Sequence, residues 1–441
     1  EGLGSYDPLA GTFRRYTLQP DGGAILPTLS VKAILAMGDG HLWVGTEHSG
    51  LYHFDPRTGD CRRYINDPQD DYSLSDNEIY SLKLDRTGVL WIGSSNGANR
   101  LDTKAKQFYH ISNQGQAGEL LSNACVWSMW ETRNRDIWIV TESGLNILNP
   151  QTGRTTQLFA DPNDPTKPSY NSFIEVVEDS MGGIWLGARD GALNRYDPET
   201  GLFQRFRALP DNPKSISDDR VFSICSDNRG AVWIGTMTGL ERYDLATGRF
   251  TRFHHDPQDT TGIPAGSVRE LYQDSQDRLW MSIWGDGAVC LDLDTGEFRH
   301  YRHDNFDGRT LSSNLVLSIT SDRQGRIWMG TTTGLNLLDP QTGHCRWYSM
   351  REGLPNNTIY RIEEDDAGRL WIATNFGLAS FNPETGDISS YVERDGIQDN
   401  EFNMGASHLG RSGMMFFGGI NGLTAFFPEE IRSNPFVPQL A

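Results

Sequence analysis

The stretch AVWIGTMTGLERYDLATGRF, residues 231–250, contains a tryptophan, glycines at turn-like places and short strand-like runs between them. Similar text recurs as RIWMGTTTGLNLLDPQTGHC at 326–345 and as HLWVGTEHSGLYHFDPRTGDC at 41–61. The tryptophan returns every 43 to 48 residues, at Trp43, Trp91, Trp138, Trp185, Trp233, Trp280, Trp328 and Trp371, and Phe416 replaces it in a ninth unit. A period in the forties made of short strands is typical of a β-propeller.

Each unit predicts four antiparallel strands. A short apolar run such as VFSIC (221–225) forms the first strand and leads into a D-x-x-G turn, Asp227 to Gly230 in this unit. In such a turn the Asp side chain caps the backbone and the Gly adopts a positive φ. The WIGT run forms the second strand, and a D-P-x-T-G-like turn joins the third to the fourth. One such sheet cannot bury both faces, so we interpret the repeated tryptophan as packing between neighbouring sheets.

Nine such units predict an all-β fold, a single β-propeller over 1–441 with nine four-stranded blades, with seven or eight as the alternative count. The last unit lacks a fourth strand, and GTFRRYT (11–17) is similar to the fourth strand GRFTRFH (248–254). We therefore predict that the N-terminal strand 12–17 pairs in the last blade and closes the ring. Residues 1–10 are interpreted as the stub of another repeat, and 429–441 as a tail toward a missing downstream domain.

The composition excludes several kinds of partner. The net charge of −19 opposes binding to nucleic acid or to an anionic membrane surface. No apolar run reaches the roughly 20 residues of a membrane span, so no membrane contact is expected within this fragment. The five cysteines are odd in number and lack a CxxC pair, which argues against a zinc site or a disulfide framework. No GxSxG, HExxH or P-loop motif occurs, and we expect no cofactor and no metal.

The order of the strands separates two faces of the ring. The D-x-x-G and D-P-x-T-G turns share one face, which we call the turn face. The connections between second and third strands, and between successive units, share the other, which we call the loop face. The loop face carries the connections that vary between repeats, so we place ligand binding there. The candidate ligand-binding residues are Lys32, Tyr80, Glu175, Arg220, Arg269, Glu270, Trp284, Asp286, Tyr360 and Arg361.

Most of these candidates stand at fixed distances before the repeated tryptophan. Ten residues before it most units have Ser or Ala, but Glu175, Glu270 and Arg361 break this rule. Such charges either pair between blades in a wet channel or contact a ligand. Trp284 lies on SIWGDGA (282–288), a connection one residue longer than its counterparts, where it either stacks on a sugar or peptide group or covers the next loop. The tryptophans in CVWSMW, Trp127 and Trp130, are interpreted as core.

The pattern VFSICSDNRGAVWIGTMTGLERYD (221–244) resembles the two-component regulator propeller repeat. The linkers NDPQDDYSLSDN (66–77) and HDPQDTTGIPAGS (255–267), and the segment FFGGINGLTAFFPEEIRSNPFVP (416–438), are also similar to that family. The resemblance implies the periplasmic sensor portion of a bacterial receptor whose output is a histidine kinase, a hybrid two-component protein or a diguanylate cyclase. It further implies a carbohydrate or small-molecule ligand, and a dimer formed through the missing downstream domains.

Two other functions remain open. Streptogramin-inactivating lyases also use G-x-I-W propeller repeats, but such a lyase needs a base and a metal with acidic and histidine ligands. None of the ten histidines falls at the first-strand places that supply the candidates. The other alternative is a passive protein–protein interaction scaffold. The chain lacks kinase, cyclase and hydrolase motifs, so we expect it to be a binding module rather than an enzyme.

Overall fold

The structure is a computed structural model that describes residues 3–16, 30–68, 73–85, 88–102, 108–113, 120–189, 191, 193–209, 212, 215–259 and 261–431. Apart from the short 3-10 helix η1 (Glu393–Asp395), the regular structure in these ranges consists of β-strands. The strands form separate antiparallel sheets, most of them four-stranded, which confirms the predicted all-β fold. The chain divides into two compact units, with the boundary between residues 106 and 107.

Unit 1, the part before residue 107, contains three sheets. β1 (Leu3–Asp7) and β2 (Thr12–Tyr16) form a two-stranded sheet. A four-stranded sheet contains β3 (Val31–Ala36), β4 (Leu42–Thr46), β5 (Leu51–Phe54) and β6 (Cys61–Tyr64). A three-stranded sheet contains β7 (Ile79–Leu84), β8 (Val89–Ser94) and β9 (Gly97–Asp102). Trp43 of the second sheet packs with Leu90 and Ile92 of the third.

Unit 2, described between residues 108 and 431, contains seven four-stranded sheets. The first three are β11 (Val126–Glu131), β12 (Ile137–Thr141), β13 (Gly144–Asn149), β14 (Arg154–Leu158); β15 (Phe173–Glu178), β16 (Ile184–Ala188), β17 (Leu193–Asp197), β18 (Leu202–Phe206); and β19 (Val221–Ser226), β20 (Ala231–Thr236), β21 (Leu240–Asp244), β22 (Arg249–Phe253). The next three are β23 (Val268–Gln273), β24 (Arg278–Ile283), β25 (Gly287–Asp292), β26 (Phe298–Tyr301); β27 (Val316–Ser321), β28 (Ile327–Thr331), β29 (Leu335–Leu338), β30 (Cys345–Tyr348); and β31 (Ile359–Glu364), β32 (Leu370–Thr374), β33 (Gly377–Phe381), β34 (Ile388–Tyr391). The seventh contains β35 (Phe402–Leu409), β36 (Met415–Gly419), β37 (Gly422–Phe426) and β10 (Tyr109–Ile111).

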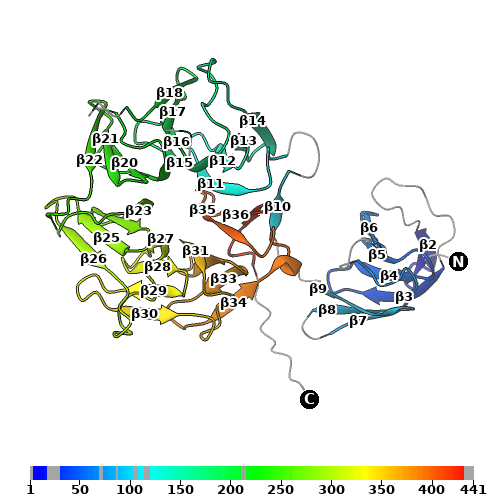
Figure 1. Cartoon of the computed structure of the whole chain (residues 1–441). Helices are drawn as coiled ribbons and strands as arrows, with labels where there is room; N and C mark the ends of the chain where they lie inside the picture. The colour runs from blue at the N-terminus through cyan, green and yellow to red at the C-terminus, as the bar shows by residue number, and fades with distance from the viewer. Residues whose placement is uncertain are drawn as a thin grey trace. The chain divides into compact units, whose positions relative to one another are not determined.

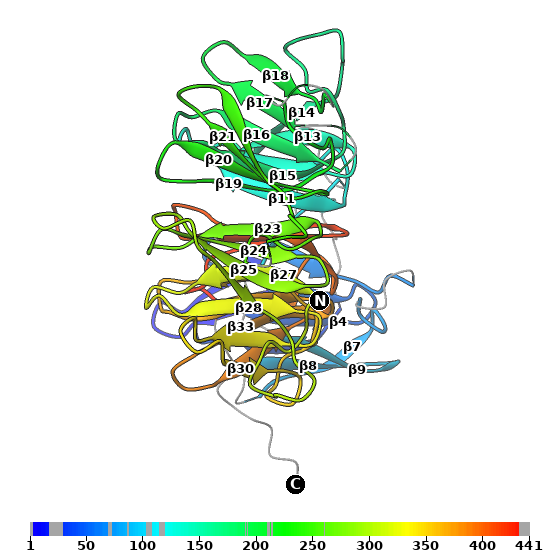
Figure 2. The same ribbon diagram turned by 60° about the vertical axis from the view of Figure 1, so that its left-hand side comes forward.

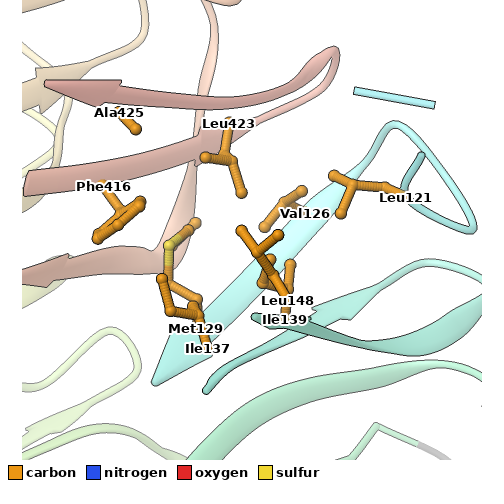
Figure 3. Packing of buried hydrophobic residues seen from close by; sticks show 10 residues of the cluster. Leu121, Val126, Met129, Ile137, Ile139, Leu148, Phe416, Leu423 and Ala425 are labelled. Carbon is orange, nitrogen blue, oxygen red and sulfur yellow. The ribbon is translucent and has the colours of Figure 1, made fainter. Parts of the chain in front are cut away.

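The sheets of unit 2 follow one another around a common centre (Figure 1), and Figure 2 shows the same sheets turned by 60°. The first strand of each sheet contacts the first strand of the next, from β11 through β15, β19, β23, β27 and β31 to β35. β35 in turn contacts β11. Figure 3 shows the apolar cluster at this junction, in which Phe416 and Leu423 of the seventh sheet pack with Val126 and Ile139 of the first. The seventh sheet therefore lies directly against the first.

The predicted closing strand is wrong. Residues 12–16 form β2 and pair with β1, with Phe13 opposite Tyr6, while residue 17 lies outside the described residues. The outer strand of the seventh sheet is β10, in which Tyr109 pairs with Ala425. The His110 ring also bonds to the carbonyl of Asn421 at 2.6 Å. The fourth strands of the units have similar sequences, and backbone pairing does not depend on side-chain identity. The repeat pattern therefore does not predict which sheet residues 109–111 join.

The predicted ring of nine blades is corrected in the same way. Seven sheets form the circle of unit 2, and the sheets that contain Trp43 and Trp91 belong to unit 1. The segment predicted as a repeat stub, 1–10, includes β1, which pairs with β2. From residue 432 on, the predicted tail lies outside the described residues.

In six of the units the repeated Asp and Trp are joined by a hydrogen bond that organises the turn. In the second sheet of unit 2, Trp185 Nε1 donates to Asp179 Oδ2 at 2.7 Å, while Asp179 Oδ1 accepts the backbone N–H of Gly183 at 2.9 Å. Trp328 and Asp322 repeat this bond at 2.9 Å. A fully buried indole needs a partner for its N–H, and the carboxylate supplies one while it caps the turn. Positive φ at the turn glycines, 89° at Gly182, confirms the predicted turn.

Candidate functional site

A bulge near the start of each first strand directs side chains toward the axis on the loop face. In the first six sheets the pairing register shifts at this point, for example between Val268 and Glu270. A bulge leaves one extra residue unpaired and re-aims its side chain. The extra residues are Trp127, Ile174, Phe222, Arg269, Leu317 and Tyr360.

The residue after each bulge lines the axis, and we call this level of the axis the waist. There Arg361 Nη1 donates to Glu270 Oε1, an ion pair between β31 and β23. Glu175 Oε1 accepts the hydroxyl of Ser128 at 2.7 Å. The two glutamates are only 8% and 5% exposed. Burial raises the pKa of Glu175 to about 7, although Arg361 acts in the opposite direction, and burial also raises the pKa of Glu270.

A cavity of about 650 Å³ extends from the waist toward the turn face, and we call it the turn-side cavity. Its wall includes Trp130, Tyr272, Glu363 and His408. The His408 ring lies 5.1 Å from the Trp130 ring, and burial lowers the pKa of His408 to about 4. Glu363 accepts a hydrogen bond of 2.7 Å from Ser407, and burial raises its pKa. This cavity is polar and holds titratable groups held away from their usual pKa.

The residues of this cavity were largely missed by the sequence reasoning. Trp130, interpreted as core, is half-buried and packs against two apolar clusters, and it also lines the cavity. Trp130, Tyr272 and Glu363 each stand eight residues before the repeated tryptophan, and His408 stands eight before Phe416. The residue eight places before the repeated tryptophan varies between units. Because the fold does not require this variation, it could have pointed to these residues.

A smaller pocket of about 50 Å³ lies on the loop face side of the waist, and we call it the loop-side pocket. The Arg269 guanidinium lies 3.6 Å from the centre of the Phe222 ring and 5.1 Å from that of Trp284. The Arg189 guanidinium lies 5.3 Å from the Trp127 ring. Glu175 and Glu270 line both this pocket and the turn-side cavity, so the waist stands between them.

Two predicted residues thus meet beside this pocket, and the prediction does not include a third residue that lines it, Arg189. Arg269 and Trp284 come together, with 46% of Trp284 exposed. Arg189 stands four residues after its tryptophan, the same place that Trp284 occupies after Trp280. Comparing that place across all repeats would have found it.

The other predicted residues are held by partners elsewhere. Lys32 and Tyr80 belong to unit 1, where Lys32 Nζ lies 2.8 Å from Glu47 Oε1. Arg220 forms two bonds with Asp218, at 2.9 and 2.7 Å.

The last two predicted residues have intramolecular partners as well. Asp286 accepts two bonds from Arg302, at 2.9 and 2.7 Å. The Tyr360 hydroxyl donates to Asn375 Oδ1 at 2.9 Å. The polar groups of these residues already bond within the protein, whereas the loop-side pocket has side chains that a ligand can contact.

The sheets, their Asp–Trp turns and the polar axis define a protein of the β-propeller class. Residues 73–96, 215–238, 310–333 and 353–376 each match the family model of the two component regulator propeller. The chain therefore contains repeats of the two-component regulator propeller family. No curated protein sequence matches it. Among the described residues, no helix has the length and apolar character needed to cross a bilayer.

Several solved structures are similar. The extracellular domain described as that of the hybrid two-component system BT3049 from B. thetaiotaomicron is 24% identical with a TM-score of 0.71, over 97% of this chain and 54% of that one. The corresponding domain of BT4673 is 20% identical with a TM-score of 0.60, over 96% of this chain and 55% of that one. An inactive virginiamycin B lyase from Staphylococcus aureus, solved with quinupristin, is 13% identical with a TM-score of 0.55, over 72% of this chain and 99% of that one. The chain spans about half the length of the two B. thetaiotaomicron structures, and at these identities the likeness establishes the fold.

Proposed function

We propose that this chain is a ligand-sensing, periplasmic propeller portion of a bacterial signal-transduction receptor, and that it binds a carbohydrate or another small polar ligand on the loop face of unit 2. The observation that carries the proposal is the meeting of Arg269, Phe222 and Trp284 beside the loop-side pocket. The family repeats support the receptor assignment, as do the similar extracellular domains of two-component systems.

The arrangement suits recognition rather than chemistry. The Asp–Trp turns and the inter-sheet packing recur from sheet to sheet, so they form a rigid frame. Trp284 and Arg269, in contrast, stand at places where the other repeats have different residues. An exposed indole beside a cation and hydrogen-bond donors is a common means of holding a sugar ring or another polar ring.

Titration calorimetry against a panel of oligosaccharides tests this proposal. Trp284→Ala and Arg269→Ala should each weaken binding at least tenfold, while the unfolding midpoint stays within about 2 °C of the wild-type value, because neither side chain is part of an apolar core. Met181→Ala, an exposed change on the turn face, is the matched control and should bind as wild type does. If Trp284→Ala and Arg269→Ala both bind the ligand with wild-type affinity, the site is elsewhere.

A lyase function is the second candidate, and His408 favours it. This ring lies in the turn-side cavity close to Glu131 and Arg411, both of which act on its pKa. Within the described ranges, however, no group of three or more His, Cys, Asp or Glu side chains could hold a metal ion. A turnover assay with a streptogramin B substrate and added Mg²⁺ decides this point, because product formation that His408→Ala abolishes would replace the sensor assignment.

A further inference from the structure

Arg189 and Arg269 differ in their partners from several other arginines of unit 2. Arg220 pairs with Asp218, Arg302 with Asp286 and Arg361 with Glu270. Neither Arg189 nor Arg269 forms an ion pair with any residue that the structure describes. The chain has 58 acidic and 39 basic residues, so carboxylates are the commoner charge.

The two guanidinium groups line the same pocket and repel each other. Burial lowers the pKa of Arg269, and the positive charge of Arg189 lowers it further. Two like charges beside a partly buried pocket destabilise each other unless an anion lies between them. Glu175 and Glu270 border the pocket, but their carboxylates are bound at the waist to Ser128 and Arg361. Arg189 and Arg269 are the cations among the residues that line this pocket.

Both arginines stack on aromatic rings, and most of their hydrogen-bond donors have no acceptor among the described residues. Arg269 lies over Phe222, and Arg189 lies over Trp127, so aromatic rings contact the faces of the guanidinium groups. The donors of a guanidinium point outward from its edge, in a fork that matches a carboxylate or sulfate. Of the Arg269 donors, Nε bonds to the Ser267 hydroxyl at 2.9 Å, and the described residues provide no acceptor for its two terminal nitrogens.

We propose that the loop-side pocket is an anion subsite: Arg189 and Arg269 together bind the carboxylate or sulfate group of an acidic saccharide, and Trp284 stacks against its sugar ring. The inference rests on the proposed function and specifies the charge of the ligand. Aromatic rings hold both forks in place before binding, so less side-chain freedom is lost when the anion arrives. A charge-assisted fork is also stronger than a neutral hydrogen bond, so the anionic group should contribute most of the affinity.

The experiment compares acidic and neutral saccharides of equal length. Calorimetry would use a tri-galacturonate, its neutral methyl ester and a sulfated disaccharide with its unsulfated form, each at about 50 and 300 mM salt. We expect at least one acidic probe to bind tenfold or more tightly than its neutral counterpart. Arg189→Met and Arg269→Met should each abolish most of that preference, and higher salt should reduce it. Arg249→Met, an exposed change in β22, is the matched control and should leave binding unchanged.

The outcomes separate the two proposals. If a neutral saccharide binds as tightly as its acidic counterpart, or if both Met variants keep the wild-type preference, the anion subsite is refuted. Should Trp284→Ala still abolish binding in that case, the proposed function stands. If no saccharide of either charge binds the wild-type protein, both proposals fail. The preference for uronate over sulfate, or the reverse, identifies which anion the two forks accept.

Discussion

Replacing Glu175 with Gln should stabilise unit 2 at pH 8 and change its stability little at pH 4. The carboxyl group is 8% exposed at the waist, where it accepts a bond from Ser128 and faces Arg361 and Glu270. Burial raises its pKa from 4.5 to about 7, because a poorly solvated carboxylate is disfavoured relative to its protonated form. Gln resembles the protonated form in size and polarity, and it stays neutral at every pH.

The magnitude follows from proton linkage. Between pH 4.5 and about 7 the folded protein holds this proton more tightly than the unfolded chain does. The free energy of unfolding therefore falls as the pH rises through this window, and each unit of pKa difference corresponds to about 1.4 kcal/mol. The wild-type protein should lose about 3 kcal/mol from this group by pH 8. The contribution of Glu175 is fully present below pH 4.5, so the variant should differ little from wild type there.

His408 acts in the opposite sense, so the wild-type curve alone would not isolate Glu175. Its pKa falls from 6.5 to about 4, so the folded protein binds fewer protons than the unfolded chain, and this group adds stability as pH rises through that window. The comparison of Glu175→Gln with wild type removes the effect, because both proteins contain His408.

Hydrogen exchange of peptides from β15 and β16, measured in urea between pH 4 and 8, reports the stability of unit 2 specifically, after correction for the intrinsic pH dependence of exchange. Glu199→Gln, an exposed change in the same sheet, is the matched control and should follow the wild-type curve. Parallel curves for Glu175→Gln and wild type across the whole pH range would refute the reasoning.

Two further changes test the frame of unit 2. Asp322→Ala leaves the N–H of fully buried Trp328 without its acceptor, so urea unfolding should show a loss of about 3 kcal/mol, against less than about 1 kcal/mol for the exposed Asp366→Ala. Equal losses would mean that the Asp–Trp bond does not organise the turn. Ile111→Asp places a charge against the apolar cluster of the first and seventh sheets, so limited proteolysis should open the seventh sheet. Phe13→Asp, in the strand first predicted to close the ring, should leave proteolysis of that sheet unchanged, and the opposite pattern would restore the N-terminal strand as the closing one.

The strands and turns were predictable because their requirements are local. A D-x-x-G turn needs one carboxylate and one positive φ within four residues, so Asp227 and Gly230 could be read directly from the sequence. The partner of strand 109–111 could not, because its pairing with β37 depends on backbone groups that every strand has. The division of the nine repeats into two units could not be predicted either. Each sheet needs a neighbour to pack against, and the sequence of a repeat does not specify which sheet that neighbour is.

The candidate site was predictable to the extent that repeats were compared at the right place. Glu270 and Arg361 stood out because sibling sheets have Ser or Ala ten residues before the tryptophan, and the structure pairs them. Arg189 stands four residues after Trp185, and His408 stands eight residues before Phe416. The prediction rests on other places in the repeat and therefore does not include them. That Arg189 and Arg269 form no ion pair with a described residue could not be predicted from any repeat, because ion pairing depends on the arrangement of several strands.

The origin of β10 has a consequence for the biosynthesis of unit 2. β10 is the first strand of this unit to be synthesised, and its partner β37 follows about 300 residues later. His110 of β10, for example, bonds to Asn421, 311 positions along the chain. Contacts this distant in sequence form slowly. A nascent chain must therefore carry β10 as an unpaired strand until β37 has been made. Two such chains that fold together can exchange β10, each supplying the outer strand of the other's seventh sheet.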